Sequence, residues 1–135
     1  MITVEYSPLP GLKNSIPQPI VPIKFIRGKK EVSTYALVDS GAAGAVISTV
    51  IAEELGIDWI KIPPKIGFSV GGNFRSHLVK IKASIFDHEF ELYVDIIEGI
   101  APYKTIIGQR DFFKRAKVIF EGYKNTFHME FRNFN

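Results

Sequence analysis

Ala36-Leu37-Val38-Asp39-Ser40-Gly41-Ala42 is the most informative stretch of this 135-residue chain. An apolar, strand-like run leads directly into a carboxylate, a hydroxyl side chain and a glycine. The run predicts that Asp39 is carried into a buried place, where a charged group is costly without a partner. Gly41 lets the backbone turn sharply and approach another segment closely, and the Ser40 hydroxyl can brace the loop by a hydrogen bond. We therefore expect Asp39 to be a functional carboxylate.

Two further elements accompany this stretch. Ile106-Ile107-Gly108 is a second apolar run that ends in glycine, and Gln109-Arg110-Asp111-Phe112-Phe113 follows it directly. Between the two runs, Phe68-Ser69-Val70-Gly71-Gly72-Asn73-Phe74 predicts a hairpin with glycines at its tip. Glycine tolerates the backbone change that closure of a lid demands, so this hairpin is a candidate lid over Asp39.

In order and spacing, these elements resemble the retropepsin-like aspartic proteases, the single-domain retroviral type. Asp39-Ser40-Gly41-Ala42 is similar to the family's Asp-Thr/Ser-Gly-Ala catalytic loop, and Ser69-Val70-Gly71-Gly72 resembles its flap. Ile106-Ile107-Gly108, with the residues after it, resembles the apolar-apolar-Gly and helix signature. The resemblance covers about residues 20–131. It implies a mostly β, closed barrel-like fold with one or two short helices.

The resemblance also implies an aspartic endopeptidase that works as a homodimer on an extended peptide or protein substrate. Asp39 would be catalytic, and Ser40 and Gly41 would support its loop. Ala42 would line the floor of the cleft, while Val70, Gly71 and Gly72 would close over the substrate, whose backbone would bind like an added strand. The chemistry calls for no cofactor and no metal.

Dimerisation is expected from the residues themselves. Peptide hydrolysis by two aspartates needs carboxylates about 3 Å apart that share one proton. The other aspartates are Asp58, Asp87, Asp95 and Asp111, and none of them is followed by Ser-Gly or Thr-Gly. One such carboxylate per chain requires two chains related by a two-fold axis. Activity should then follow a bell-shaped pH profile that belongs to the pair.

The sequence departs from the family pattern at three positions. Ser40 replaces the commoner threonine and keeps its hydroxyl. Ala43 stands where many retroviral members have a second aspartate, so we expect Arg110 to lack that partner. Gln109 is an extra residue between the signature glycine and the arginine. Arg110 and Asp111 are otherwise expected to be a surface ion pair of little energetic weight.

Composition and local patterns bound the remaining expectations. Residues 1–135 suit one domain, with a proline-rich arm over residues 1–19 that could take part in the dimer contact. Residues 48–56 and 109–116 are the helix candidates. The chain has no cysteine, its net charge is only +3, and no apolar run approaches the length of a membrane span. We expect a cytoplasmic protein that binds neither membrane nor nucleic acid.

Two other functions stay open at this point. The chain could be a catalytically weak or inactive protease-like module for binding or dimerisation, because folds outlive their chemistry. A small basic barrel that binds nucleic acid is a weaker alternative, which predicts steeply salt-dependent binding. His77, His88 and His128 show no metal-ligand spacing and are expected on the surface or on strand faces.

Overall fold

The computed structural model of the chain describes residues 1–69, 72–98 and 105–132. Its strands are β1 (Ile2–Glu5), β2 (Ile20–Arg27), β3 (Lys30–Val38), β4 (Ala45–Ser48), β5 (Lys65–Ser69), β6 (Gly72–Ile85), β7 (His88–Ile97), β8 (Thr105–Ile107), β9 (Ala116–Glu121) and β10 (Thr126–Phe131). Its helical segments are α1 (Thr49–Glu54) and the 3₁₀ turns η1 (Trp59–Lys61) and η2 (Gly122–Lys124).

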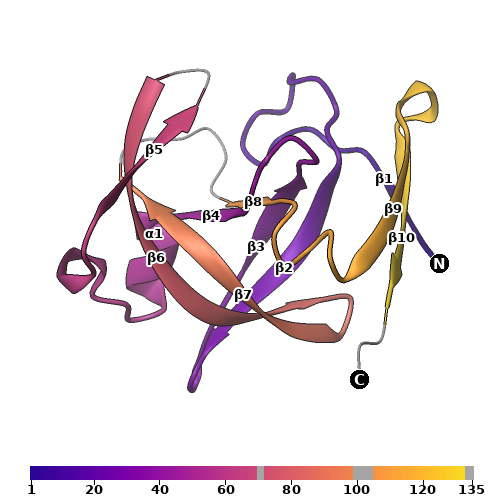
Figure 1. Cartoon of the computed structure of the whole chain (residues 1–135). Coiled ribbons are helices and arrows are strands. Elements are labelled where there is room, and N and C mark those ends of the chain that lie inside the picture. The colour runs from indigo at the N-terminus through magenta and orange to yellow at the C-terminus, as the bar shows by residue number, and fades with distance from the viewer. Residues whose placement is uncertain (70–71, 99–104, 133–135) are drawn as a thin grey trace.

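Six of these strands close into a barrel (Figure 1). They follow the order β2-β3-β8-β4-β7-β6, and β6 returns to pair with β2 between Lys24 and Ile26. β5 is added to the free side of β6. Alternate residues of the strands fill the interior, as the burial of Phe90, Leu92, Val94 and Ile96 along β7 shows. The predicted mostly β, closed barrel is confirmed.

Local sequence signals explain several connections. Gly28, with a φ of 61°, lies in the tight turn that joins β2 to β3. Helix α1 begins at the N-cap Ser48, whose hydroxyl accepts from the Ile51 amide, and Gly56 follows with a φ of 72°. The prediction of a helix over 48–56 is confirmed.

The second predicted helix, over residues 109–116, is wrong. These residues form successive turns before β9 begins. Asp111 has a φ of 69°, in the left-handed region, which interrupts any right-handed helix at that point. Phe112 is nonetheless buried, and Phe113 packs beside it with the rings edge-to-face.

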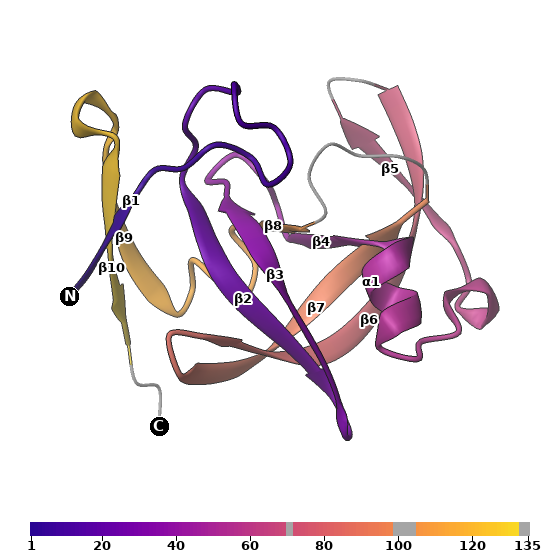
Figure 2. The same cartoon turned by 180° about the vertical axis from the view of Figure 1, so that it is seen from behind.

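A separate three-stranded sheet, β1-β10-β9, stands beside the barrel, opposite the β5–β6 hairpin (Figures 1 and 2). Phe131 of β10 joins the sheet to the barrel, because its ring stacks on His88 and meets Phe112 edge-to-face. Within this sheet, the N-terminal strand β1 pairs with β10 of its own chain, with Ile2 opposite Met129. In the proline-rich arm, Ser7 and Gln18 form an isolated antiparallel bridge.

Within the described residues, no helix has the length and apolar character needed to cross a membrane.

Candidate active site

Asp39 follows the last residue of β3, at the start of a tight loop that leads to β4. The Asp39 amide donates to the Ile107 carbonyl at 3.0 Å, and the Asp39 carbonyl accepts from the Ala42 amide at 3.1 Å. The carboxylate atom Oδ1 accepts from the Gly41 amide at 2.9 Å. The backbone on both sides of the carboxylate is thus fixed by hydrogen bonds.

The Asp39 carboxylate has no cationic partner in the described part of the chain. The ion pairs there all involve other acids, and the Gly41 amide is the hydrogen-bond donor to the side chain. The residue is half-buried in the single chain, less enclosed than the sequence predicts. A structural aspartate that ends an apolar strand would normally be paired, so this one is free to act on another group.

The second signature lies directly against this loop. β8 runs parallel to β3, with Leu37 opposite Ile106 and Val38 opposite Ile107. A Cβ placed on Gly108 would lie 2.4 Å from the Ala42 carbonyl oxygen, a distance that no side chain tolerates. Only glycine therefore lets the two segments touch.

The residues after Gly108 continue this contact. The Gln109 amide donates to the Ala42 carbonyl at 2.9 Å, and the Arg110 amide donates to the Ala43 carbonyl at 2.8 Å. The Gln109 side chain donates from Nε2 to the Ser40 carbonyl at 2.7 Å. The Gln109 side chain thus holds the Ser40 carbonyl in place.

Of the residues predicted to bind substrate, Ala42 lies in the Asp39 loop, half-buried. Gly72 is the first residue of β6, pairs with Ser69 across the hairpin and has a φ of 114°. Val70 and Gly71 lie outside the described residues. The two strands that flank them, β5 and β6, pair antiparallel as expected for a hairpin.

Arg110 has a partner that the sequence analysis did not predict. In place of an acid at position 43, the carboxylate of Asp95 on β7 lies 3.8 Å from Arg110 Nη2. The same nitrogen donates to the Tyr93 carbonyl at 3.3 Å, and the expected pair with Asp111 is present at 3.7 Å. Asp111 in turn accepts from the Tyr93 amide at 2.8 Å, so the segment after Gly108 is fastened to β7.

A buried histidine marks the base of the β5–β6 hairpin. His77 lies on strand β6, as the expected strand-face position allows, and it is only 2% exposed. Its Nδ1 lies 2.6 Å from the Ile62 carbonyl oxygen and its Nε2 lies 2.7 Å from the Glu98 carboxylate. Both ring nitrogens thus lie within hydrogen-bond distance of an oxygen atom, which fixes the orientation of the ring. These two contacts of the His77 ring connect β6 to the segment before β5 and to the residue that follows β7.

Sequence reasoning missed Gln109 and Asp95. Gln109 was noted as an extra residue, and its position directly after a close-packed glycine was the available signal. No sequence signal distinguished Asp95, because it is one of several acids on an alternating strand and its partners come from three distant segments.

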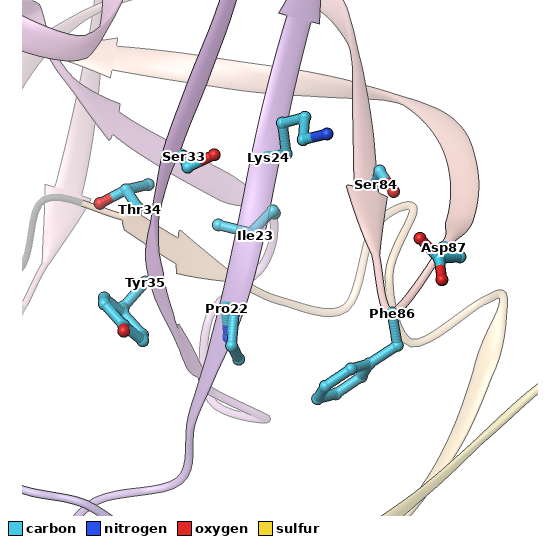
Figure 3. A pocket seen from close by; sticks show the side chains of 9 residues that line it. All are labelled: Pro22, Ile23, Lys24, Ser33, Thr34, Tyr35, Ser84, Phe86 and Asp87. Atoms are coloured by element: carbon cyan, nitrogen blue, oxygen red, sulfur yellow. The ribbon is translucent and has the colours of Figure 1, made fainter.

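A hollow on the side of the barrel lies away from these groups. Figure 3 shows its lining by strands β2 and β3 and by the β6–β7 turn, with the Phe86 ring pointing toward Pro22. Phe86 and Asp87 in that turn have φ values of 46° and 66°. The lining contains one carboxylate, Asp87, and no histidine. It therefore lacks a paired acid and base, and the described residues contain no cluster of three or more metal-ligating acids or histidines.

Comparison with known proteins gives a structural relationship and no sequence relationship. No family model matches the chain, and no curated protein matches it. The structure is similar to the crystal structure of a retropepsin-like aspartic protease from Rickettsia conorii, with a TM-score of 0.70 and 14% identity. The match covers 96% of this chain and 99% of that one. The fold is therefore retropepsin-like over nearly the whole chain.

Proposed function

We propose that this protein is an aspartic endopeptidase that acts as a homodimer, with Asp39 of each subunit in one shared active site. The observation that carries the proposal is the Asp39 loop. In a retropepsin-like fold, an aspartate at the end of β3 is held by backbone hydrogen bonds, and its carboxylate has no cationic partner among the described residues. Such a carboxylate is positioned but not neutralised, as a catalytic acid or base must be.

Two copies are needed because one carboxylate cannot serve as base and acid together. In a two-fold dimer the paired Asp39 carboxyls share one proton, since two like charges so close together cannot both ionise. The ionised carboxylate takes a proton from a water molecule while the protonated one donates a hydrogen bond to the scissile carbonyl. The water oxygen bonds to the carbonyl carbon. The C–N bond then breaks as a proton passes to the leaving amine.

The features that favoured an inactive module carry less weight in this structure. Gln109 braces the Asp39 loop through its side chain and its amide. Arg110 takes Asp95 in place of an acid at position 43. Neither departure from the family pattern disturbs the loop that holds Asp39, which supports retention of catalysis.

The first test is cleavage of a peptide library between acid and neutral pH by wild type, Asp39→Asn and Asp39→Ala. We expect cleavage by the wild type with a bell-shaped pH profile, and a loss of at least about 10³-fold in both variants, comparable to removal of an essential acid–base group. Asp87→Asn is the matched control, because its turn tolerates asparagine at positive φ. Full cleavage by Asp39→Ala would refute the proposal.

A mixing experiment tests the shared site. Asp39→Asn subunits are added in equal amount to wild type and allowed to exchange. Random pairing leaves about half of the wild-type subunits with a wild-type mate, so cleavage should fall to about half. An unchanged rate, together with a monomeric mass in scattering at the assay concentration, would show that one subunit suffices and would exclude the paired mechanism.

A further inference from the structure

The carboxylate of Asp95 on β7 contacts three separate segments of the chain. Oδ1 lies 3.1 Å from Lys65 Nζ on β5 and accepts from the Ser76 hydroxyl on β6 at 3.3 Å. Oδ2 lies 3.8 Å from Arg110 Nη2, in the segment after Gly108. Lys65 and Ser76 are directly opposite each other in the β5–β6 hairpin. One acid therefore contacts both strands of the hairpin and the segment that borders the Asp39 loop.

Burial and charge make this contact more than a surface ion pair. The Asp95 side chain is 17% exposed and Ser76 is fully buried. Two cations face this carboxylate, and removing its charge would take from Lys65 its acidic partner among the described residues and leave Arg110 with Asp111 alone. Interactions of partly buried charges are screened less by solvent than those of exposed pairs.

Arg110 connects Asp95 to the loop that carries Asp39. Its amide donates to the Ala43 carbonyl, and a Cβ on Gly44 would lie 2.7 Å from its Nη2. The guanidinium thus lies against the outgoing half of the loop while it faces Asp95. In the described residues this is a continuous path from the hairpin, through Asp95 and Arg110, to the backbone beside Asp39.

We propose that Asp95 is a positioning residue that holds the base of the β5–β6 hairpin in register with the Asp39 loop. The inference rests on the proposed peptidase function. A hairpin that covers an extended peptide contributes to substrate binding only if it stays aligned with the carboxyls, so loss of this alignment should appear as a raised KM. Asp95 touches neither the Asp39 carboxylate nor its loop directly and acts through Arg110.

The first experiment needs no catalytic activity. Amide hydrogen exchange is compared in wild type, Asp95→Asn and the control Glu89→Gln, which removes the same charge from an exposed position on the same strand. Asp95→Asn should speed exchange about tenfold both in β5 and at Gln109 and Arg110, with the β2–β3 amides unchanged. Faster exchange in β5 alone, or no difference from Glu89→Gln, would overturn the proposal.

The second experiment separates positioning from loss of folded enzyme. Asp95→Asn should raise KM about tenfold or more while the pH profile keeps its shape, because the Asp39 pair is intact. A merely unstable variant would lower the apparent kcat at unchanged KM, and that result would overturn the proposal. Lys65→Met should produce part of the same effect, and its combination with Asp95→Asn should be less than additive.

The two readouts distinguish failure of this inference from failure of the proposed function. If wild type cleaves no peptide, the peptidase assignment fails, and the exchange data alone decide whether Asp95 couples the hairpin to the loop. If wild type cleaves and Asp95→Asn matches Glu89→Gln in both readouts, the peptidase assignment stands and the role given to Asp95 is refuted.

Discussion

The Asp39 loop and the β5–β6 hairpin are held in place by different kinds of interaction. The loop is fixed by backbone hydrogen bonds from Asp39, Gln109 and Arg110, and by the close approach of Gly108 to Ala42. The hairpin is fixed at its base by side chains, those of Asp95 and His77. Backbone packing leaves a segment little freedom, whereas side-chain links can break one at a time.

This difference suits the proposed chemistry. A carboxylate that must meet its symmetry mate within hydrogen-bond distance needs a fixed backbone. A hairpin that admits a substrate must open, and it can do so if a few polar contacts at its base yield while the barrel stays closed. We therefore expect the loop to be the more rigid of the two segments.

The largest effect is expected from Gly108→Ala. The new Cβ would lie 2.4 Å from a backbone oxygen and 2.9 Å from a backbone carbon of Ala42, neither of which can move without moving the loop. We expect a loss of about 3 kcal/mol in the free energy of unfolding, measured by urea denaturation, and loss of peptide cleavage. Gly122→Ala is the control, because its Cβ would meet nothing closer than 3.9 Å. Equal stabilities for the two variants would show that the loop contact is not rigid.

His77→Leu should have the next largest effect, and in the hairpin. Leucine removes both ring nitrogens and leaves the Ile62 carbonyl and the Glu98 carboxyl group without these hydrogen-bond partners, at a cost of about 2 kcal/mol. Hydrogen exchange should quicken in β5 and β6 but not at Gln109. The exposed His88→Leu should cost less than about 1 kcal/mol. Faster exchange in the Asp39 loop of His77→Leu would mean that the two segments are not held independently at this point.

The same difference explains what the sequence could predict. The Asp39 loop was predictable because its determinants, Asp39 to Ala42 and Ile106 to Gly108, are short motifs in which glycine allows close approach. The two strands on either side of the glycines in residues 68–74 were predictable for a similar reason. The loop and these strands depend on residues that are neighbours in the chain, or on the two glycine-containing motifs that contact each other.

The remaining features depend on contacts that no local pattern records. Asp111 takes a left-handed φ where its carboxylate accepts from the Tyr93 amide, so the expected helix over 109–116 gives way to turns. His77 is buried because its partners come from residues 62 and 98. Asp95 likewise meets residues that are 15 to 30 positions away in either direction. The alternation of apolar and polar residues along a strand indicates which face of the sheet a side chain lies on, but it does not indicate which distant residues that side chain contacts.

Gly44→Ala tests the contact between the two segments. Its Cβ would displace the end of the Arg110 side chain, which is flexible, so the cost should be near 1 kcal/mol. The displacement should weaken the Arg110–Asp95 contact and leave Lys65–Asp95 intact. We therefore expect faster exchange at Arg110 with β5 unchanged, the complement of Lys65→Met. Simultaneous loosening of β5 would show that Arg110, rather than Asp95, governs the hairpin.

The smallest effect is expected from the Lys80–Glu91 pair, which joins β6 to β7 at 3.0 Å on the exposed face. The hydrogen bond from Lys80 lowers the pKa of Glu91 below its ordinary 4.5, and the same bond raises the pKa of Lys80 above 10.5. Because the pKa of Glu91 is lowered, its contribution to stability is present above the pKa of the unfolded state and is lost as pH falls through the pKa of the folded state. Because the pKa of Lys80 is raised, its contribution is present below the pKa of the unfolded state and is lost as pH rises through the pKa of the folded state.

Glu91→Gln should therefore be slightly less stable than wild type near neutral pH, and the difference should vanish as pH falls through the lowered pKa of Glu91 in the folded state. Urea denaturation at several pH values measures it, and added salt should shrink it because both side chains are more than half exposed. A loss near neutral pH as large as that of His77→Leu would mean that this pair, and not the buried contacts of Asp95 and His77, holds β6 to β7. In that case the hairpin would be fixed along its outer face, and its base would no longer explain how it opens.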